Sequence, residues 1–259
     1  MHIWNFPPDH RRDSQVPTEP LKVGEQGELQ LTEAQRERWG VAPGAEFVVQ
    51  ELPYGLLLCR VDPALARVFV EPTTACNLTC RTCVRRSWSE PEGFMPMATY
   101  LRLIEGLRAV PTLRAVSFWG FGEPLLHPEI VAMVRLAHDL GARTDLISNG
   151  LLLDGALARG LVEAGLDRFV VSIDSTSEEG YAHIRTGGNL HQLEENLATL
   201  RTARRAGARR NPEIGIEFVA MRRNVPEMGK LRRLAERVGA SLIVVTNVLP
   251  YSEELKDEI

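Results

Sequence analysis

Residues 73–83 read TTACNLTCRTC and hold three of the four cysteines of the chain, Cys76, Cys80 and Cys83. The C-x3-C-x2-C spacing puts three thiols on one tight loop, and thiolates are the usual protein ligands of iron–sulfur clusters. A four-iron cluster with three protein ligands keeps one iron open, and a small molecule can bind there. The loop therefore predicts a [4Fe–4S] cluster with one open coordination position.

Zinc is the alternative metal for this loop. Structural zinc takes four closed ligands, so a fourth would have to come from elsewhere in the chain, and Cys59 or His127 could supply it. Neither residue lies in a second C-x2-C or H-x3-H arrangement, which disfavours zinc. A third interpretation, three buried structural cysteines, does not explain their clustering on one loop.

The composition is that of an ordinary globular protein, with 44% hydrophobic and 25% charged residues among 259. This length suits one large domain with a small appendage. The formal net charge of -4 gives no overall attraction to nucleic acid or to anionic membranes. We expect no membrane span, because no apolar run is long enough, and no export signal at the N-terminus. Clustered cysteines without such a signal indicate a cytoplasmic protein.

From residue 67 onward, apolar runs typical of buried strands alternate with amphipathic helices. The expected strands are 67–71, 115–119, 143–147, 168–173, 213–219 and 241–245. The expected helices are 97–109, 128–140, 154–164, 190–206 and 227–238.

Glycines mark the helix ends, since Gly141, Gly165, Gly207 and Gly239 each follow the last apolar turn of a helix. This is the position of the left-handed glycine that ends a helix before the next strand. Six such units predict an α/β fold with a parallel sheet, either a barrel or an open sheet. In a barrel-like array, working residues lie just beyond the strand C-termini.

The first 62 residues differ from this pattern. Residues 1–20 are rich in Pro, Asp and Arg and read as a flexible lead-in, and residues 21–62 read as a separate β-rich domain. Thr32 and Gln35 form a capping box that predicts a short helix to about Trp39. Turns at Pro43-Gly44 and Tyr54-Gly55 then separate two further strands.

The cysteine loop and its place after the first strand resemble the radical S-adenosylmethionine (SAM) superfamily over residues 67 to about 250, within a domain that we place at 65–259. The resemblance implies a partial (β/α)6 barrel that holds a [4Fe–4S] cluster and SAM. It also implies reductive cleavage of SAM to a 5′-deoxyadenosyl radical that abstracts hydrogen from a substrate, with a ferredoxin or flavodoxin as electron donor. Thr82 departs from the aromatic residue that many members carry before the last cysteine, which argues against some branches.

Further motifs support this resemblance. Gly120, Gly122, Glu123 and Pro124 resemble the G-x-G-E-P loop that binds the SAM amino group, and glycines there let the backbone approach a ligand. A plain loop turn is the alternative. Ser148-Asn149-Gly150 resembles a turn that contacts the SAM ribose, although Asn-Gly is also a common turn.

The fourth strand and the segment after it add three candidates. Ser172 and Asp174 point the same way, because side chains alternate along a strand. In similar enzymes such a serine lies beside the SAM carboxylate and the acid lies near the substrate, although Asp174 could equally cap the next segment. Arg185 resembles an arginine that pairs with the SAM carboxylate, the alternative being a surface arginine. Glu217 is a weaker candidate.

Residues 71–74 (EPTT), 84–95 and 247–254 resemble the tungsten cofactor oxidoreductase maturases, radical SAM proteins with a C-terminal SPASM domain. The resemblance implies action on an oxidoreductase or its cofactor. A SPASM domain needs more cysteines, but none follows Cys83. We therefore expect a piece of a longer chain, with that domain missing.

Residues 21–62 resemble an AbrB/MazE-like unit, which dimerises and binds DNA in transcription factors. Between residues 21 and 60, four basic side chains face six acidic ones, whereas a DNA-binding face should be basic. We therefore favour homodimerisation or substrate docking over DNA binding. Two other functions stay open: radical modification of a ribosomally made peptide, and a DNA-binding regulator whose cluster senses redox state.

Overall fold

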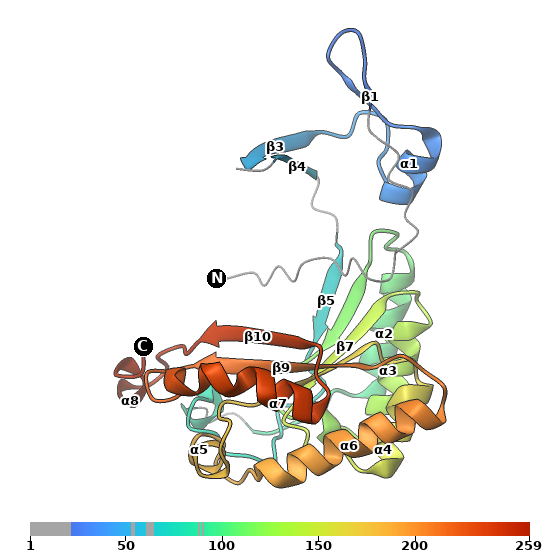
Figure 1. The fold of residues 1–259 in the computed structure, drawn as a ribbon. Coiled ribbons are helices and arrows are strands. Elements are labelled where there is room, and N and C mark those ends of the chain that lie inside the picture. The colour runs from blue at the N-terminus through green and yellow to red at the C-terminus, as the bar shows by residue number, and fades with distance from the viewer. Residues whose placement is uncertain (1–21, 53–54, 61–64, 88, 90) are drawn as a thin grey trace. The chain divides into compact units, whose positions relative to one another are not determined.

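The computed structural model describes residues 22–52, 55–60, 65–87, 89 and 91–259 (Figure 1). The chain divides into two compact units, an N-terminal unit within residues 1–63 and a C-terminal unit within residues 64–259. The predicted lead-in, residues 1–20, lies outside the described residues. So does Tyr54, the first residue of the predicted Tyr54-Gly55 turn.

In its described residues, the N-terminal unit contains two small antiparallel pairs of strands and one helix. Strand β1 (Lys22–Val23) pairs with β2 (Leu29–Gln30), and β3 (Phe47–Leu52) pairs with β4 (Gly55–Arg60). Helix α1 spans Glu33–Trp39 and has the predicted capping box, in which the Thr32 hydroxyl accepts from the Gln35 backbone N–H. The predicted end of the helix at Trp39 is confirmed.

The C-terminal unit is built on a six-stranded parallel sheet in the order β10-β9-β8-β7-β6-β5. Its strands agree with the predicted ones: β5 Arg67–Val70, β6 Ala115–Phe118, β7 Arg143–Ser148, β8 Arg168–Ser172, β9 Glu213–Ala220 and β10 Leu242–Asn247. Strands β5 and β10 each pair with a single neighbour, so the sheet is an open, partial barrel. The predicted α/β class and parallel sheet are confirmed.

The longer helices lie along one face of this sheet, whereas the short α8 (Glu253–Lys256) lies beyond the carboxyl ends of β9 and β10 (Figure 1). Besides α8, the helices are α2 Met97–Arg108, α3 Ile130–His138, α4 Gly155–Glu163, α5 Glu178–Ile184, α6 Leu190–Ala206 and α7 Leu231–Val238. Strand side chains such as Val116, Phe118 and Leu146 pack against them in one large hydrophobic core. Burial of this core is the main stabilising contribution to the unit.

The opposite face of the sheet carries charged groups. Ser117, Asp145, Arg168 and Glu213 lie in one row across four neighbouring strands. Arg67 donates to Ser117 and to Asp145, both at 3.0 Å, and Arg168 pairs with Glu213 at 3.0 Å. Each charge in this row has an opposite partner, which offsets part of the cost of removing it from water. The candidate site lies further along the strands, toward their carboxyl ends.

Two helices differ from the predictions. Helix α5 was not predicted, although Ser177 caps it and accepts from the Gly180 N–H. The predicted helix 227–238 starts as a 3-10 helix, Val225–Lys230, before α7. Gly229 lies in this 3-10 stretch and has low α-helix propensity, which favours the tighter turn.

For one of the four glycines, the prediction of a left-handed residue at the helix end is wrong. Gly141, Gly165 and Gly239 have φ values of 75°, 84° and 73°, as predicted. Gly207 has φ of -78°, and the left-handed residue is Ala208 at 49°. The Arg209 N–H reaches back to the Arg204 carbonyl, so the chain reverses one residue later than the glycine.

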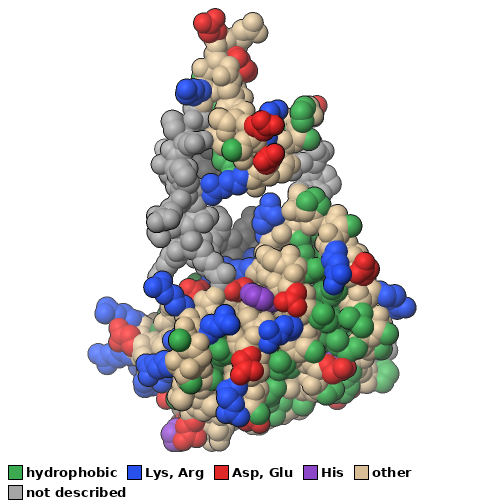
Figure 2. Space-filling model, turned by 90° about the vertical axis from the view of Figure 1, so that its right-hand side faces the viewer, with side chains coloured by type: hydrophobic (Ala, Val, Ile, Leu, Met, Phe, Trp, Pro, Cys, Tyr) green, Lys and Arg blue, Asp and Glu red, His purple; other side chains and the backbone are tan. Residues whose placement is uncertain are grey.

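The surface of the C-terminal unit carries both signs of charge. On the face in Figure 2, Lys and Arg side chains are interspersed with Asp and Glu. Among the described residues, no helix is long and apolar enough to cross a membrane.

Candidate active site

The cysteine loop directly follows β5 and is held by the residues at the end of helix α5. The backbone N–H of Thr79 donates to the Thr186 carbonyl at 3.1 Å, and that of Arg81 donates to the Ile184 carbonyl at 2.9 Å. These two bonds flank Cys80, which is buried, while Cys76 and Cys83 are half-buried. Burial raises the pKa of both Cys76 and Cys80.

The glycine loop after β6 packs against the cysteine loop. The Glu123 N–H donates to the Ala75 carbonyl at 2.8 Å. A Cβ atom on Gly122 would lie 1.9 Å from the Thr73 carbonyl oxygen, so only glycine fits at this position. The backbones of the two loops are therefore in direct contact.

Glu71, directly after β5, holds the glycine loop through hydrogen bonds to its backbone. Its carboxylate accepts from the N–H groups of Phe121 at 2.6 Å and Gly122 at 3.3 Å. A Cβ on Gly120 would lie 2.3 Å from this carboxylate. Glu71 therefore fixes which backbone groups of the loop remain available to a ligand.

Glu123 joins the glycine loop to the turn after β7. Its carboxylate accepts from the Ser148 hydroxyl at 2.7 Å, the Asn149 N–H at 2.8 Å and the Leu125 N–H at 2.9 Å. Burial raises the pKa of Glu123, and these hydrogen bonds act against that rise. Both carboxylate oxygens are thus occupied by the protein itself.

Two carboxylates, Glu217 and Asp174, have partners in the fold near the end of β8. The Ser172 hydroxyl donates to Glu217 at 3.2 Å, and burial raises the pKa of Glu217. Asp174 is fully buried and pairs with Arg185 through the Nε and Nη2 atoms at 2.9 and 2.8 Å. Asp174 also accepts from the Val219 N–H at 2.9 Å, so it does not cap the next helix.

One cavity of about 230 Å³ brings most of the predicted site residues together at the carboxyl ends of the strands. Ten of them line it: Cys76, Cys80, Cys83, Gly120, Gly122, Glu123, Ser148, Asn149, Ser172 and Arg185. Pro124 and Asp174 are buried behind its wall instead. Three thiols, a close-packed glycine loop and a guanidinium around one cavity form a donor set that fits an iron–sulfur cluster with an amino-acid-like ligand.

Trp119 and Tyr251 also line this cavity but were not predicted as site residues. Trp119 directly follows β6, and Glu71 directly follows β5. The rule that functional residues follow strand ends could therefore have identified Trp119 and Glu71. Tyr251 lies beyond the last strand, and no local sequence pattern indicates its position.

His127 is not available as a zinc ligand. Its Nδ1 accepts from the Glu129 N–H at 3.2 Å, so the Nε2–H donates to the Met95 carbonyl at 3.0 Å. Both ring nitrogens are therefore used within the fold. The side chain of Cys59, the other proposed fourth ligand, lies outside the described residues.

A parallel βα sheet with three thiols around a cavity at its carboxyl edge is the arrangement of a cofactor-dependent enzyme. The family model of the radical SAM superfamily matches residues 70–235, and the chain belongs to that superfamily. The cofactors of the superfamily are a [4Fe–4S] cluster and SAM. The predicted family, enzyme class and cofactors are confirmed.

Two curated relatives with different functions are similar in sequence to this chain. The chain is 29% identical over 196 residues to the tungsten-containing aldehyde ferredoxin oxidoreductase cofactor-modifying protein of Pyrococcus furiosus, covering 74% of this chain and 54% of the relative. It is 29% identical over 191 residues to the PqqA peptide cyclase of Gluconobacter oxydans, covering 73% and 51%. The chain thus spans about half the length of these relatives.

Among solved structures, the fold is similar to that of SuiB of Streptococcus suis bound to S-adenosylmethionine. The TM-score is 0.62 at 15% identity, and the match covers 76% of this chain and 44% of SuiB. This likeness supports the fold of the C-terminal unit.

Proposed function

We propose that Cys76, Cys80 and Cys83 hold the [4Fe–4S] cluster and that SAM binds beside it in the 230 Å³ cavity. The observation that carries the proposal is that the cysteines, Gly122 and Arg185 line one cavity at the carboxyl edge of the sheet. When bound, the reduced cluster supplies the electron for reductive cleavage of SAM. The thiols lie in a region without disulfides among the described residues, which suits the reducing cytoplasm.

The protein residues bind and orient the cofactor. The 120–122 loop would receive the SAM amino group, and Glu71 holds this loop in place through the N–H groups of Phe121 and Gly122. Arg185 offers a guanidinium to the SAM carboxylate while Asp174 fixes its orientation. Ser148 and Asn149 present the turn that would contact the ribose, held by Glu123.

The substrate of the proposed reaction is a tungsten oxidoreductase or its cofactor. The relative from Pyrococcus furiosus is named as modifying the cofactor of such an oxidoreductase, and the resemblance of residues 84–95 and 247–254 points the same way. The second candidate is a ribosomally made peptide, which the similarity to a peptide cyclase favours. A ferredoxin or flavodoxin is the proposed electron donor for either reaction.

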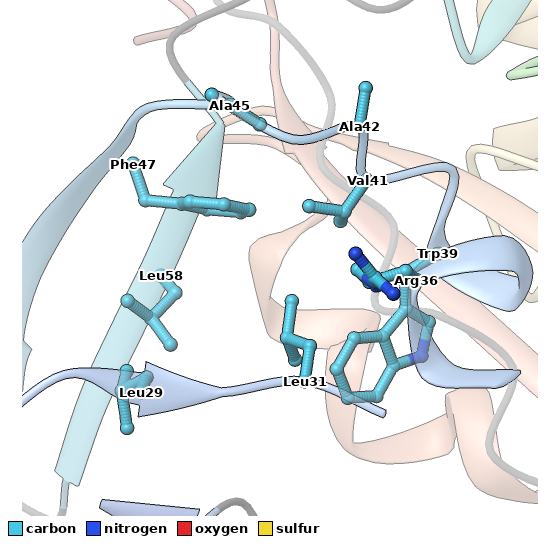
Figure 3. A pocket seen from close by; sticks show the side chains of 10 residues that line it. Leu29, Leu31, Arg36, Trp39, Val41, Ala42, Ala45, Phe47 and Leu58 are labelled. Carbon is cyan, nitrogen blue, oxygen red and sulfur yellow. The ribbon is translucent and has the colours of Figure 1, made fainter. Parts of the chain in front are cut away.

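The N-terminal domain, residues 21–62, is proposed to dimerise. Leu29, Leu31, Trp39, Phe47 and Leu58 surround a mostly apolar cavity of about 660 Å³ (Figure 3). Trp39 and Leu58 are 43% and 37% exposed, and a small domain of two strand pairs buries too little apolar surface to be stable alone. A second copy that fills this cavity would supply the missing burial.

The cluster assignment is tested by anaerobic reconstitution with iron and sulfide. Iron content, the visible absorbance and 5′-deoxyadenosine formed from SAM and dithionite are measured in the wild type and in Cys76→Ala, Cys80→Ala and Cys83→Ala. Each of the three variants should lose product, while Cys59→Ala, the matched control, should retain it. A colourless protein with stoichiometric zinc would refute the assignment.

The substrate is tested by incubating the reconstituted enzyme with a cofactor-deficient tungsten aldehyde oxidoreductase and, separately, with the short peptide encoded nearest its gene. Gain of oxidoreductase activity supports the maturase role. A mass change in the peptide alone supports peptide modification. If the protein binds specific DNA and forms no 5′-deoxyadenosine, the alternative of a redox-sensing regulator is correct.

A further inference from the structure

Glu217 of β9 is a carboxylate that a ligand in the 230 Å³ cavity can reach. Among the described residues, two carboxylates line this cavity, Glu123 and Glu217. Glu123 is 2% exposed and already accepts three hydrogen bonds from the protein. Glu217 is only half-buried, and within the described part of the chain its side chain accepts one hydrogen bond, from the Ser172 hydroxyl to Oε2. Its Oε1 atom is therefore free to face a group of the ligand.

The strand register points Glu217 into this cavity. Glu217 lies directly opposite Ser172 of the neighbouring parallel strand β8, and paired residues present their side chains on the same face of a sheet. Val219, two residues further along β9, also lines the cavity, as the alternation of side chains requires. The position of Glu217 in the cavity wall is therefore set by the sheet itself.

Glu217 has no ion-pair partner of its own among the described residues. Arg185 is the one Lys or Arg side chain that lines the cavity in this part of the chain, and Asp174 holds it through Nε at 2.9 Å and Nη2 at 2.8 Å. Burial raises the pKa of Glu217, and the nearby charge of Arg185 offsets only part of this rise. A cation that binds beside Glu217 would supply the counter-charge that favours its ionised form.

The ligand proposed for this cavity carries such a charge. SAM has a carboxylate, an ammonium and a sulfonium group, whereas S-adenosylhomocysteine lacks one methyl group and has a neutral thioether in place of the sulfonium. Arg185 is the proposed partner of the SAM carboxylate, and the 120–122 loop is that of the ammonium group. The sulfonium is thus the charged group of SAM that still needs a partner of opposite sign.

We propose that Glu217 is a specificity-determining residue whose carboxylate recognises the sulfonium charge of SAM and so favours SAM over S-adenosylhomocysteine. The inference rests on the proposed binding of SAM in this cavity. Attraction between charges falls off slowly with distance and is stronger away from bulk water, so Glu217 needs no hydrogen bond to the sulfonium. Ser172, which donates to Oε2, keeps the carboxylate in place.

The test measures ligand binding to the reconstituted 259-residue protein by anaerobic calorimetry at neutral pH. The ligands are SAM, S-adenosylhomocysteine and sinefungin, which carries a protonated amine in place of the sulfonium. Glu217→Gln removes the charge but keeps the shape and an oxygen that can accept from Ser172. It should weaken the binding of SAM and sinefungin about tenfold and change that of S-adenosylhomocysteine less than about twofold, because only a charge interaction is lost.

Two further variants separate charge from structure. Glu217→Asp keeps the charge on a side chain one carbon shorter and should retain most of the preference for SAM. Glu179→Gln removes an exposed carboxylate of α5 that does not line the cavity, and it should leave all three affinities unchanged. Iron content and melting temperature are compared with those of the wild type, so that a change in affinity is not confused with a loss of fold or cluster.

An equal loss for all three ligands in Glu217→Gln would overturn the inference, because it would mean that Glu217 contacts a group that they share. No loss for any ligand would overturn it as well. A wild type that assembles no cluster, or that binds none of the three ligands, would instead overturn the proposed function.

Discussion

The backbone N–H of Asn149 donates to Glu123 at 2.8 Å and so joins the loop after β6 to the turn after β7. The two residues are 26 positions apart, and each follows a strand of the parallel sheet. Because the carboxyl ends of neighbouring parallel strands meet at one edge, a single buried carboxylate can organise two loops of the site. Glu123 thus binds groups of the protein, and under the proposed function it affects the cofactor only through these two loops.

Replacing Glu123 with Gln should damage both folding and SAM binding. An amide nitrogen cannot accept from Ser148, Asn149 and Leu125, so at least one donor faces another donor in a buried site. We expect a loss of about 1–3 kcal/mol in the free energy of unfolding, measured by urea denaturation, and weaker SAM binding by calorimetry. The exposed Glu129→Gln should change neither quantity.

Gly122→Ala should prevent the glycine loop from packing on the cysteine loop. The added Cβ would lie 1.9 Å from the Thr73 carbonyl oxygen and 2.9 Å from that of Ala75. Backbone must shift, so we expect reduced cluster content and weaker SAM binding. Gly106→Ala, in α2 with no atom within 4 Å of the added Cβ, should instead stabilise the protein by about 0.5–1 kcal/mol. Equal effects of the two changes would contradict the packing argument.

Asp174→Asn should be strongly destabilising, because it leaves the buried Arg185 guanidinium without its counter-charge. Breaking a buried pair in this way costs about 3–5 kcal/mol, measurable by thermal or urea unfolding of the metal-free protein. The exposed pair of Arg232 with Glu236, at 3.0 Å, supplies the control. Arg232→Ala should cost at most about 1 kcal/mol.

Low pH should destabilise the fold at the loop after β8, because the Glu227 carboxylate holds that loop. Burial raises the pKa of Glu227, but hydrogen bonds from the Thr176 backbone and hydroxyl and from Ser175 outweigh it, so the pKa lies below its usual value. A carboxyl whose pKa is lower in the folded state stabilises the fold above its unfolded pKa and loses this effect as pH falls through the folded pKa. Wild type should exceed Glu227→Gln in unfolding free energy at pH 7, and the gap should shrink as the pH is lowered through the acidic range. A gap that is constant with pH would contradict this role.

Phe47→Asp should abolish the proposed dimer of the N-terminal domain, because it places a charge in the wall of the apolar cavity. Light scattering after size exclusion gives the mass. The control Gln26→Asp adds the same charge in the turn between β1 and β2, outside the cavity walls, and should leave the dimer intact. A wild type that is monomeric at micromolar concentration would refute the proposal.

Much of the fold could be predicted because its signals are local. Buried parallel strands read as short apolar runs, and most of the helix-ending glycines lie where a left-handed residue is needed. Helix α5 was missed because its seven residues are too few for a clear hydrophobic period. Ala208 shows the limit of the glycine rule, since the hydrogen bond from Arg209 to Arg204 decides which residue turns left-handed.

The sequence by itself determined the superfamily of this protein and the proposed cluster ligands: the spacing of Cys76, Cys80 and Cys83 is a short-range property, and one loop suffices to present three thiols. Tertiary structure alone decided the partners of the buried polar groups, as in the pairing of Ser172 with Glu217 across 45 residues and the support of the glycine loop by Glu71. Such contacts depend on strand register and side-chain direction at the carboxyl edge of the sheet. They form only once the whole sheet is assembled, because burial then compels each polar group to find a donor or acceptor.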